Sequence, residues 1–151
     1  AQMVNVLQAV ILTRDDQLVL TPTYYVFKMY RIHQGALMIP VTVESEDYIL
    51  DGDTIPSMHA SASSKDGVLN ITLCNLNPGK PISVEIEYSE LDFIAADGSI
   101  IHGETMNDHN DFGQPEALNI QPFALPVPGR GSYLIELPAK SVVLVRLTVG
   151  G

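Results

Sequence analysis

The sequence predicts a mainly β protein: an antiparallel β-sandwich, jelly-roll-like or immunoglobulin-like, preceded by one α-helix. Two observations support this fold class. From Ala36 onward, β-branched runs with a period of two are separated by short turn sequences. Before Gly35, a single window carries helix start and stop signals. Because no second helical window follows, the later residues fit two packed antiparallel sheets best.

The helical window is "LTPTYYVFKMYRIHQGA". Thr21 suits the N-cap, Pro22 the first helical position and Gly35 the left-handed position after the last turn, which predicts a helix of about four turns. Apolar residues cover most of its circumference and leave a narrow polar stripe, made of Lys28, Arg31 and Gln34. This distribution predicts a helix that is buried on more than one side. The alternative is an ordinary amphipathic surface helix.

The expected strands are the runs "ALMIPVTVE", "VLNITLCNL", "ISVEIEYSEL", "SYLIELP" and "SVVLVRLTV". Turn chemistry at "DGDT", "KDG", "NPGKP", "ADGS" and "PGRGS" separates them. The polar, proline-containing stretch from His102 to Pro128 reads as a long connection with one short strand near Leu118 to Phe123.

Length and composition predict one hydrophobic core and exclude some classes of partner. The chain has 151 residues, of which 46% are hydrophobic. Eighteen acidic against eight basic residues give a net charge of -10, which repels phosphate backbones and anionic lipid surfaces. We therefore expect neither a nucleic acid nor a membrane partner. Cys74 has no second cysteine to pair with.

Five segments in order resemble the C-terminal part of glycoside hydrolase family 51, the α-L-arabinofuranosidases. They are "AQMVNVLQAVILT", the helical window, "LCNLNP", "MNDHNDFGQPEAL" and "LPAKSVVLVRL". The resemblance implies that residues 1–35 are the end of a catalytic (β/α)8 barrel, with its last loop (Met3 to Leu12) and last helix, and that residues 36–151 are the C-terminal β-sandwich domain. The helix would then lie between the barrel and the sandwich.

The resemblance also implies a function. The parent would be a bacterial hydrolase, a glycosidase that removes terminal non-reducing α-L-arabinofuranosyl residues from arabinan or arabinoxylan with retention and without a cofactor. The matching substrate-binding residue is Gln2, whose amide offers one acceptor and two donors to sugar hydroxyls. It would lie at a barrel strand end, where active sites of this fold are found.

We expect no catalytic residue in this chain. The two catalytic glutamates of the family lie in motifs ending Gly-Asn-Glu and beginning Asp-Glu-Trp, and neither motif occurs here. Glu85, Glu87 and Glu90 alternate with apolar neighbours and predict a solvated strand face. The fragment alone is therefore predicted to be inactive.

Other polar clusters have structural explanations. "HGETMNDHND" could supply metal ligands, but its spacing matches no standard site, and a hydrogen-bonded loop around His109 and Asn110 is favoured. "DGDT" favours a tight turn over a calcium loop. His33 favours capping or packing at the helix end. We predict no metal site.

A second function class stays open: a free-standing, non-catalytic β-sandwich that binds carbohydrate or a protein partner. The chain has no tryptophan for a sugar-binding platform, and several tyrosines lie in the helical window, which counts against this class. A homo-oligomer is compatible with the resemblance, as are a cytoplasmic and a periplasmic location.

Overall fold

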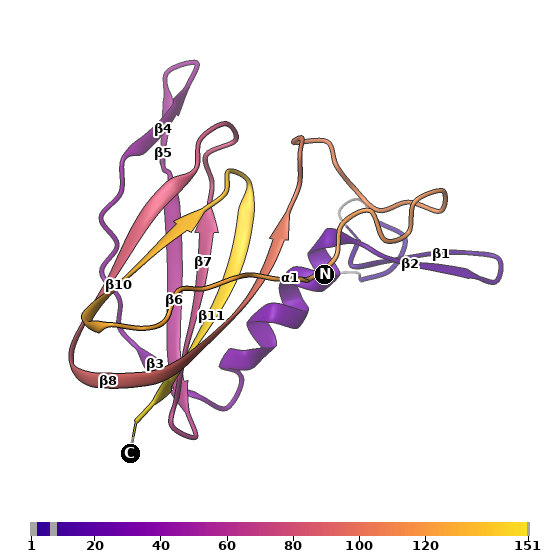
Figure 1. The fold of residues 1–151 in the computed structure, drawn as a ribbon. Helices are drawn as coiled ribbons and strands as arrows, with labels where there is room; N and C mark the ends of the chain where they lie inside the picture. The colour runs from indigo at the N-terminus through magenta and orange to yellow at the C-terminus, as the bar shows by residue number, and fades with distance from the viewer. Residues whose placement is uncertain (1–2, 7–8, 151) are drawn as a thin grey trace.

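The protein is a two-layer antiparallel sandwich with one helix on its outside (Figure 1). The computed structural model describes residues 3–6 and 9–150. The strands are β1 (Ile11–Arg14), β2 (Gln17–Leu20), β3 (Leu37–Ile39), β4 (Asp47–Leu50), β5 (Asp53–Pro56), β6 (Met58–Lys65), β7 (Val68–Asn75), β8 (Ile82–His102), β9 (Gln121–Pro122), β10 (Arg130–Leu137) and β11 (Ser141–Val149). Helix α1 (Pro22–Tyr30) is followed by a 3₁₀ turn, η1 (Arg31–His33).

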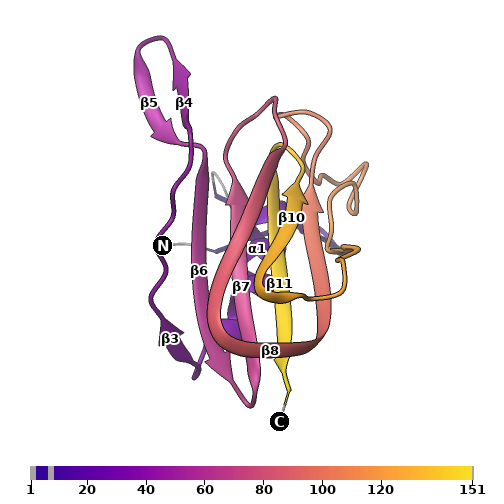
Figure 2. The ribbon, with the colours of Figure 1, turned by 60° about the vertical axis from the view of Figure 1, so that its left-hand side comes forward.

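One long strand joins the two layers. Strand β8 has 21 residues, and the sheet order is β10-β8-β11-β7-β6-β3, with β9 also pairing with β8. Ile82 to Glu87 and Asp92 pair with β10, whereas Phe93 and the residues from Ala95 to His102 pair with β11. Figure 2 shows β8 curving around the base of the sandwich, so that β10 and the first half of β8 face the larger sheet. The predicted antiparallel sandwich is confirmed.

The core lies between these layers. Alternate residues of the paired strands point inward, and Leu73, Leu137, Val143, Val145 and Leu147 are at most 2% exposed. Val145 lies opposite Ile71 on one side and Gly98 on the other, so β11 is the central strand of the larger sheet. The period of two in the sequence therefore corresponds to this alternation.

Two of the sequence motifs meet at one end of the sandwich. The buried Asn75, from "LCNLNP", donates hydrogen bonds from Nδ2 to the carbonyl oxygens of Leu137 and Pro138, at 3.2 and 3.0 Å. The Lys140 ammonium donates to the Pro78 carbonyl at 2.9 Å. The end of β7 is thereby tied to the turn between β10 and β11.

Helix α1 packs on the outer face of the larger sheet. Met29 is 3% exposed and contacts Ile101 and Leu144, which point away from the sandwich core. Phe27 is 63% exposed. The helix therefore buries one apolar side and leaves another uncovered.

The helix is shorter than predicted. Gly35 has the expected positive φ of 65°, but α1 ends at Tyr30 and the next three residues form η1. In a 3₁₀ turn, residues three apart point the same way, and this brings both Tyr30 and His33 against the sheet. Thr21 occupies the N-cap position without making a side-chain capping bond, because its hydroxyl bonds elsewhere.

Three of the predicted turns form as expected. Asp51 and Gly52 both have positive φ and connect β4 to β5, and Asp66 and Gly67 do the same between β6 and β7. These are the primed two-residue turns that the Asp-Gly pairs favour. Residues 76–81, which include "NPGKP", lead from β7 to β8, and the Asn77 side chain accepts two backbone hydrogen bonds there.

The turn predicted at "ADGS" is wrong, because Ala96 to Ser99 continue β8 opposite β11. Gly98 has a different reason to be glycine. A Cβ there would lie 2.6 Å from the Phe123 carbonyl oxygen, and the Phe123 amide donates to the Gly98 carbonyl at 2.9 Å. The glycine therefore allows another backbone segment to approach closely.

Three further local predictions need correction. "PGRGS" contains the start of β10 with a register shift between Arg130 and Ser132, where Gly131 has φ 81°. The run beginning at Ala36 forms only the short strand β3, which stops before Pro40. The loop expected up to Leu12 instead leads into the β1–β2 hairpin. The short strand expected between Leu118 and Phe123 is present as β9.

Candidate functional site

The candidate site is the N-terminal end of the chain, which contains Gln2, the substrate-binding residue that the sequence predicts. Gln2 itself lies outside the described residues, but the segment after it is held firmly. The Met3 carbonyl oxygen accepts hydrogen bonds from the amides of Val10 and Ile11, both at 3.0 Å. Asn5, at φ 52°, accepts from the Thr13 amide at 2.7 Å and donates to the Thr13 hydroxyl at 2.8 Å. The backbone next to Gln2 is therefore fixed by β1.

Thr21 fixes the other side of this segment. Its hydroxyl donates to the Ala9 carbonyl oxygen at 2.7 Å and lies 3.1 Å from the Val10 carbonyl oxygen, and its amide donates to Val10 at 3.2 Å. Ala9 and Val10 are buried. The start of α1 is thus attached to the segment that precedes β1, which explains why Thr21 does not cap its own helix.

The loop of residues 103–120 lies beside the β1–β2 hairpin (Figure 1). Asn110 connects the two, because its Nδ2 donates to the Leu20 carbonyl at 2.8 Å and to the Leu118 carbonyl at 2.7 Å. Its Oδ1 accepts from the Leu118 amide at 2.7 Å. The Arg14 guanidinium also lies 4.1 Å from the centre of the Phe112 ring, in a cation–π contact.

The acidic residues of this loop shape its backbone. Asp108 accepts from the Thr105 amide and hydroxyl, at 2.9 and 2.5 Å, and these bonds lower the pKa of its carboxyl group. The amides of Gln114 and Gly113 similarly lower the pKa of Asp111. His109 lies 3.9 Å from Asp111 in an exposed pair. Within residues 3–6 and 9–150, no group of three or more potential ligands from His, Cys, Asp and Glu gathers around a metal position. The hydrogen-bonded loop is the arrangement seen.

The carboxylates considered as catalytic candidates lie elsewhere. Glu85 and Glu87 are exposed on the outer face of β8, opposite Leu134 and Ser132 of β10. This confirms the solvated strand face for these two residues. The side chain of Glu90 lies outside the described part of the structure.

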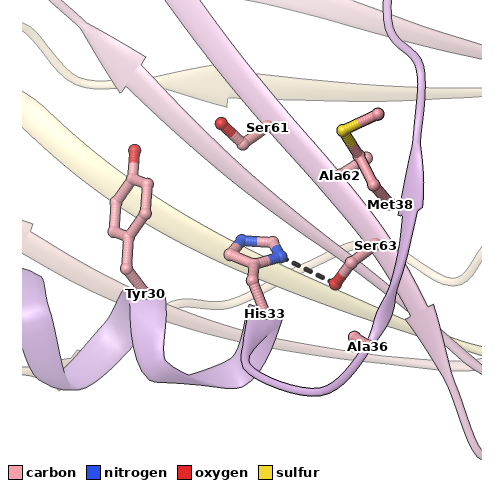
Figure 3. A pocket seen from close by; sticks show the side chains of 7 residues that line it. All are labelled: Tyr30, His33, Ala36, Met38, Ser61, Ala62 and Ser63. Atoms are coloured by element: carbon pink, nitrogen blue, oxygen red, sulfur yellow. Dashed lines mark hydrogen bonds between the residues drawn. The ribbon is translucent and has the colours of Figure 1, made fainter.

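A second polar cluster lies where the end of the helical segment meets the sheet. His33 Nδ1 is 2.7 Å from the Ser63 hydroxyl (Figure 3). His33 Nε2 is 3.1 Å from the Thr72 hydroxyl. The Tyr30 hydroxyl lies 3.3 Å from Cys74 Sγ. Burial raises the pKa of Tyr30 to about 12 and lowers the pKa of His33. Both rings are therefore uncharged at neutral pH, and His33 packs against the sheet rather than capping the helix.

An open pocket of about 250 Å³ lies at this junction, between β6, the helical end and β3 (Figure 3). It is lined by Tyr30, His33, Ala36, Met38, Ser61, Ala62 and Ser63. This lining contains no carboxylate, so it cannot supply the acid and nucleophile that glycoside hydrolysis requires.

Among the described helical segments, none is long and apolar enough to cross a bilayer.

Sequence reasoning missed the contacts of Asn110 and Thr21. Asn110 was placed correctly in a hydrogen-bonded loop, but its partner Leu20 is 90 positions away in the chain. Thr21 has the residue type expected of an N-cap, but its hydroxyl donates a hydrogen bond to the carbonyl oxygen of Ala9, 12 positions earlier in the chain. A local pattern does not show partners at such separations.

Comparison with known proteins identifies relatives along nearly the whole chain. A family model for the α-L-arabinofuranosidase C-terminal domain matches residues 1–141. An intracellular exo-α-L-arabinofuranosidase from Bacteroides ovatus is 40% identical over 149 residues, which are 97% of this chain and 29% of that protein.

Solved structures agree with this assignment. The glycoside hydrolase family 51 arabinofuranosidase from Xanthomonas axonopodis pv. citri matches with a TM-score of 0.92 and 36% identity, covering 98% of this chain and 30% of that one. A thermostable family 51 α-L-arabinofuranosidase from Thermotoga petrophila matches with a TM-score of 0.80 and 25% identity, covering 97% of this chain and 32% of that one. The chain spans about three tenths of the length of these relatives. It therefore belongs to the family of α-L-arabinofuranosidase C-terminal domains.

Proposed function

We propose that this chain is the C-terminal part of a bacterial α-L-arabinofuranosidase that removes terminal α-L-arabinofuranosyl residues from arabinan or arabinoxylan with retention. The observation that carries the proposal is the extent of the match. The 36% identity and the TM-score of 0.92 extend over 98% of the chain, and so beyond the sandwich to the segment around α1. A sandwich recruited for another purpose would not need that segment.

The uncovered side of α1 supports a domain boundary after residue 35. Met29 is buried against the sheet, whereas Phe27 is 63% exposed and Tyr24 is half-buried. A helix with large apolar residues on two sides fits a position between two packed bodies. Residues 1–35 would then complete a catalytic barrel that precedes them, and residues 36–151 would form the accessory sandwich.

Within this enzyme, Gln2 would bind the arabinofuranose. Its amide can donate to one sugar hydroxyl and accept from another. The two carboxyl groups of a retaining glycosidase lie about 5 Å apart, one acting as nucleophile and the other as acid and base. The barrel would supply both, and this chain would supply the amide and the segment that holds it.

The test is made on the full-length protein. We expect the reading frame upstream of Ala1 to encode a barrel of about three hundred or more residues. We also expect its product to hydrolyse an aryl α-L-arabinofuranoside. Gln2→Ala should lower kcat/KM by about 10-fold or more, through lost hydrogen bonds to the sugar, and leave Tm nearly unchanged.

Two results would count against the proposal. An independent start just before Ala1 would favour the non-catalytic binding module. Unchanged kinetics, or a large loss of Tm, in the Gln2→Ala protein would show that Gln2 has a structural role instead.

A further inference from the structure

Asn110 is a buried side chain that connects two distant parts of the chain. It is 2% exposed, yet it belongs to the loop of residues 103–120 and not to the core of the sandwich. Its two donated bonds end on the carbonyl oxygens of Leu20, at the end of β2, and Leu118, farther along the loop. Its Oδ1 accepts the Leu118 amide. Only an amide of this length both donates two bonds and accepts one here.

A second set of bonds continues from β2 toward the N-terminus. Leu20 is followed by Thr21, whose hydroxyl donates to Ala9 at 2.7 Å and whose amide donates to Val10 at 3.2 Å. The Val10 amide in turn donates to the Met3 carbonyl at 3.0 Å. Hydrogen bonds and the peptide bond between Leu20 and Thr21 therefore link Asn110 to Met3, the residue that follows Gln2.

We propose that Asn110 is a positioning residue for the arabinofuranosidase reaction. It holds the end of β2 against the loop and, through Thr21 and Val10, sets the place of Met3, the residue that follows Gln2. This inference rests on the proposed function, in which Gln2 binds the sugar. It assigns a role in substrate binding to a residue of the sandwich domain, on the far side of the domain boundary from the barrel.

The chemical change that tests this role is Asn110→Asp in the full-length protein. Aspartate keeps the size and the accepting oxygen, but it cannot donate to Leu20 and Leu118, and its charge faces their carbonyl oxygens. Asn107→Asp is the matched control, because Asn107 is an exposed asparagine of the same loop with the same change of charge. Since a misplacement of about 1 Å can cost about 100-fold, we expect Asn110→Asp to lower kcat/KM by roughly 10- to 100-fold. Asn107→Asp should leave it unchanged.

A double-variant measurement separates positioning from general destabilisation. If Asn110 acts through Gln2, the protein with both Gln2→Ala and Asn110→Asp should lose no more kcat/KM than Gln2→Ala alone. The two single variants should also divide their losses between kcat and KM in the same way. The inference would be overturned if the loss of kcat/KM in the double variant equalled the product of the two single losses, or if Asn110→Asp kept the wild-type kcat/KM.

If Asn110→Asp does not fold, Thr21 tests the same linkage one step closer to Gln2. Thr21→Val removes the hydroxyl that bonds Ala9 and keeps the shape, and Thr21→Ser retains that hydroxyl. We expect a loss in the valine variant that the serine variant restores and that does not add to Gln2→Ala. Equal activity of the two variants would overturn the inference. Unchanged kinetics of Gln2→Ala would instead remove the role of Gln2, on which the inference depends.

Discussion

His33 joins the helical segment to the sheet through both nitrogens of its ring. Thr72 Oγ1 donates to the Ser61 carbonyl at 3.4 Å, so it is free to accept from His33 Nε2. In the tautomer that carries its proton on Nε2, the Ser63 hydroxyl donates to Nδ1 at 2.7 Å. This arrangement suits the neutral ring, and a second ring proton would displace the hydroxyl proton of Ser63.

The pH dependence of stability follows from this histidine. Its pKa is lowered below the ordinary value of 6.5 by burial, so the unfolded chain binds its proton at a higher pH than the folded chain. The contribution of neutral His33 to the free energy of unfolding is therefore complete above about pH 6.5 and decreases as the pH falls below that value. Urea unfolding between pH 5 and 8 should show this decrease in the wild type.

The control for that measurement is His33→Gln. This variant should lack the part of the pH dependence that His33 causes, while His59→Gln, at an exposed position on β6, should retain it. Identical pH profiles for the wild type and His33→Gln would contradict the assignment.

The two sides of helix α1 should respond differently to truncation. Met29 is 3% exposed between Ile101 and Leu144, so Met29→Ala should lower the free energy of unfolding by about 2–5 kcal/mol. Phe27 is 63% exposed, so Phe27→Ala should change it by less than about 0.5 kcal/mol. Chemical denaturation of the 151-residue chain measures both values.

The same pair of variants also tests the proposed position of the helix. In the full-length protein, a barrel would cover Phe27, and Phe27→Ala should then become destabilising. If Phe27→Ala leaves the free energy of unfolding of the full-length protein nearly unchanged, this side of the helix lies at the surface.

Gly98 should be intolerant of a side chain although it lies in a regular strand. A Cβ would meet the Phe123 carbonyl oxygen at 2.6 Å and the Leu125 side chain at 2.9 Å, so β9 and the residues after it would have to move away from β8. We expect Gly98→Ala to cost about 1–3 kcal/mol of stability.

Gly79→Ala is the matched control, because a Cβ added at Gly79 would meet only the Asn77 side-chain oxygen, at 4.0 Å, and the φ of Gly79 is not positive. It should be tolerated within about 0.5 kcal/mol. Equal Tm values for the two variants would show that the segment around Phe123 adjusts freely.

At the scale of the whole molecule, the chain is a β-sandwich that belongs to the family of α-L-arabinofuranosidase C-terminal domains. The carboxylates that could be compared with a catalytic pair, Glu85 and Glu87, are exposed on one strand face. The segment after Gln2 is instead held by bonds to β1 and to Thr21, the N-cap of α1, and the loop of residues 103–120 binds Leu20, the neighbour of Thr21. Residues 103–120 and the outer face of the larger sheet thus contact the segment that contains β2 and α1.

We therefore predict that the purified 151-residue chain does not hydrolyse an aryl α-L-arabinofuranoside above the rate in buffer. Both catalytic carboxyl groups of the retaining reaction would be supplied by the barrel. Release of the aryl group is the measurement, and the full-length protein is the positive control. Clear turnover by the chain alone, with contamination excluded, would contradict the proposed division of roles.

Local chemistry in the sequence determined the strand periodicity and several turns. Asp51-Gly52 and Asp66-Gly67 adopt positive φ as predicted, because the preference of these residue types acts within the turn itself. Pro22 at the helix start and the left-handed Gly35 follow from the same kind of local preference. The five ordered motifs also point to the family to which the chain belongs.

Contacts between distant residues were decided by the tertiary structure. "ADGS" has turn chemistry, but pairing with β11 and the approach of Phe123 keep Gly98 in β8. The passage of β8 from one layer to the other, and the bond from Asn110 to Leu20, likewise depend on neighbours far away in the sequence. Local preferences amount to about 1 kcal/mol or less per residue, and burial and pairing with distant segments can override them.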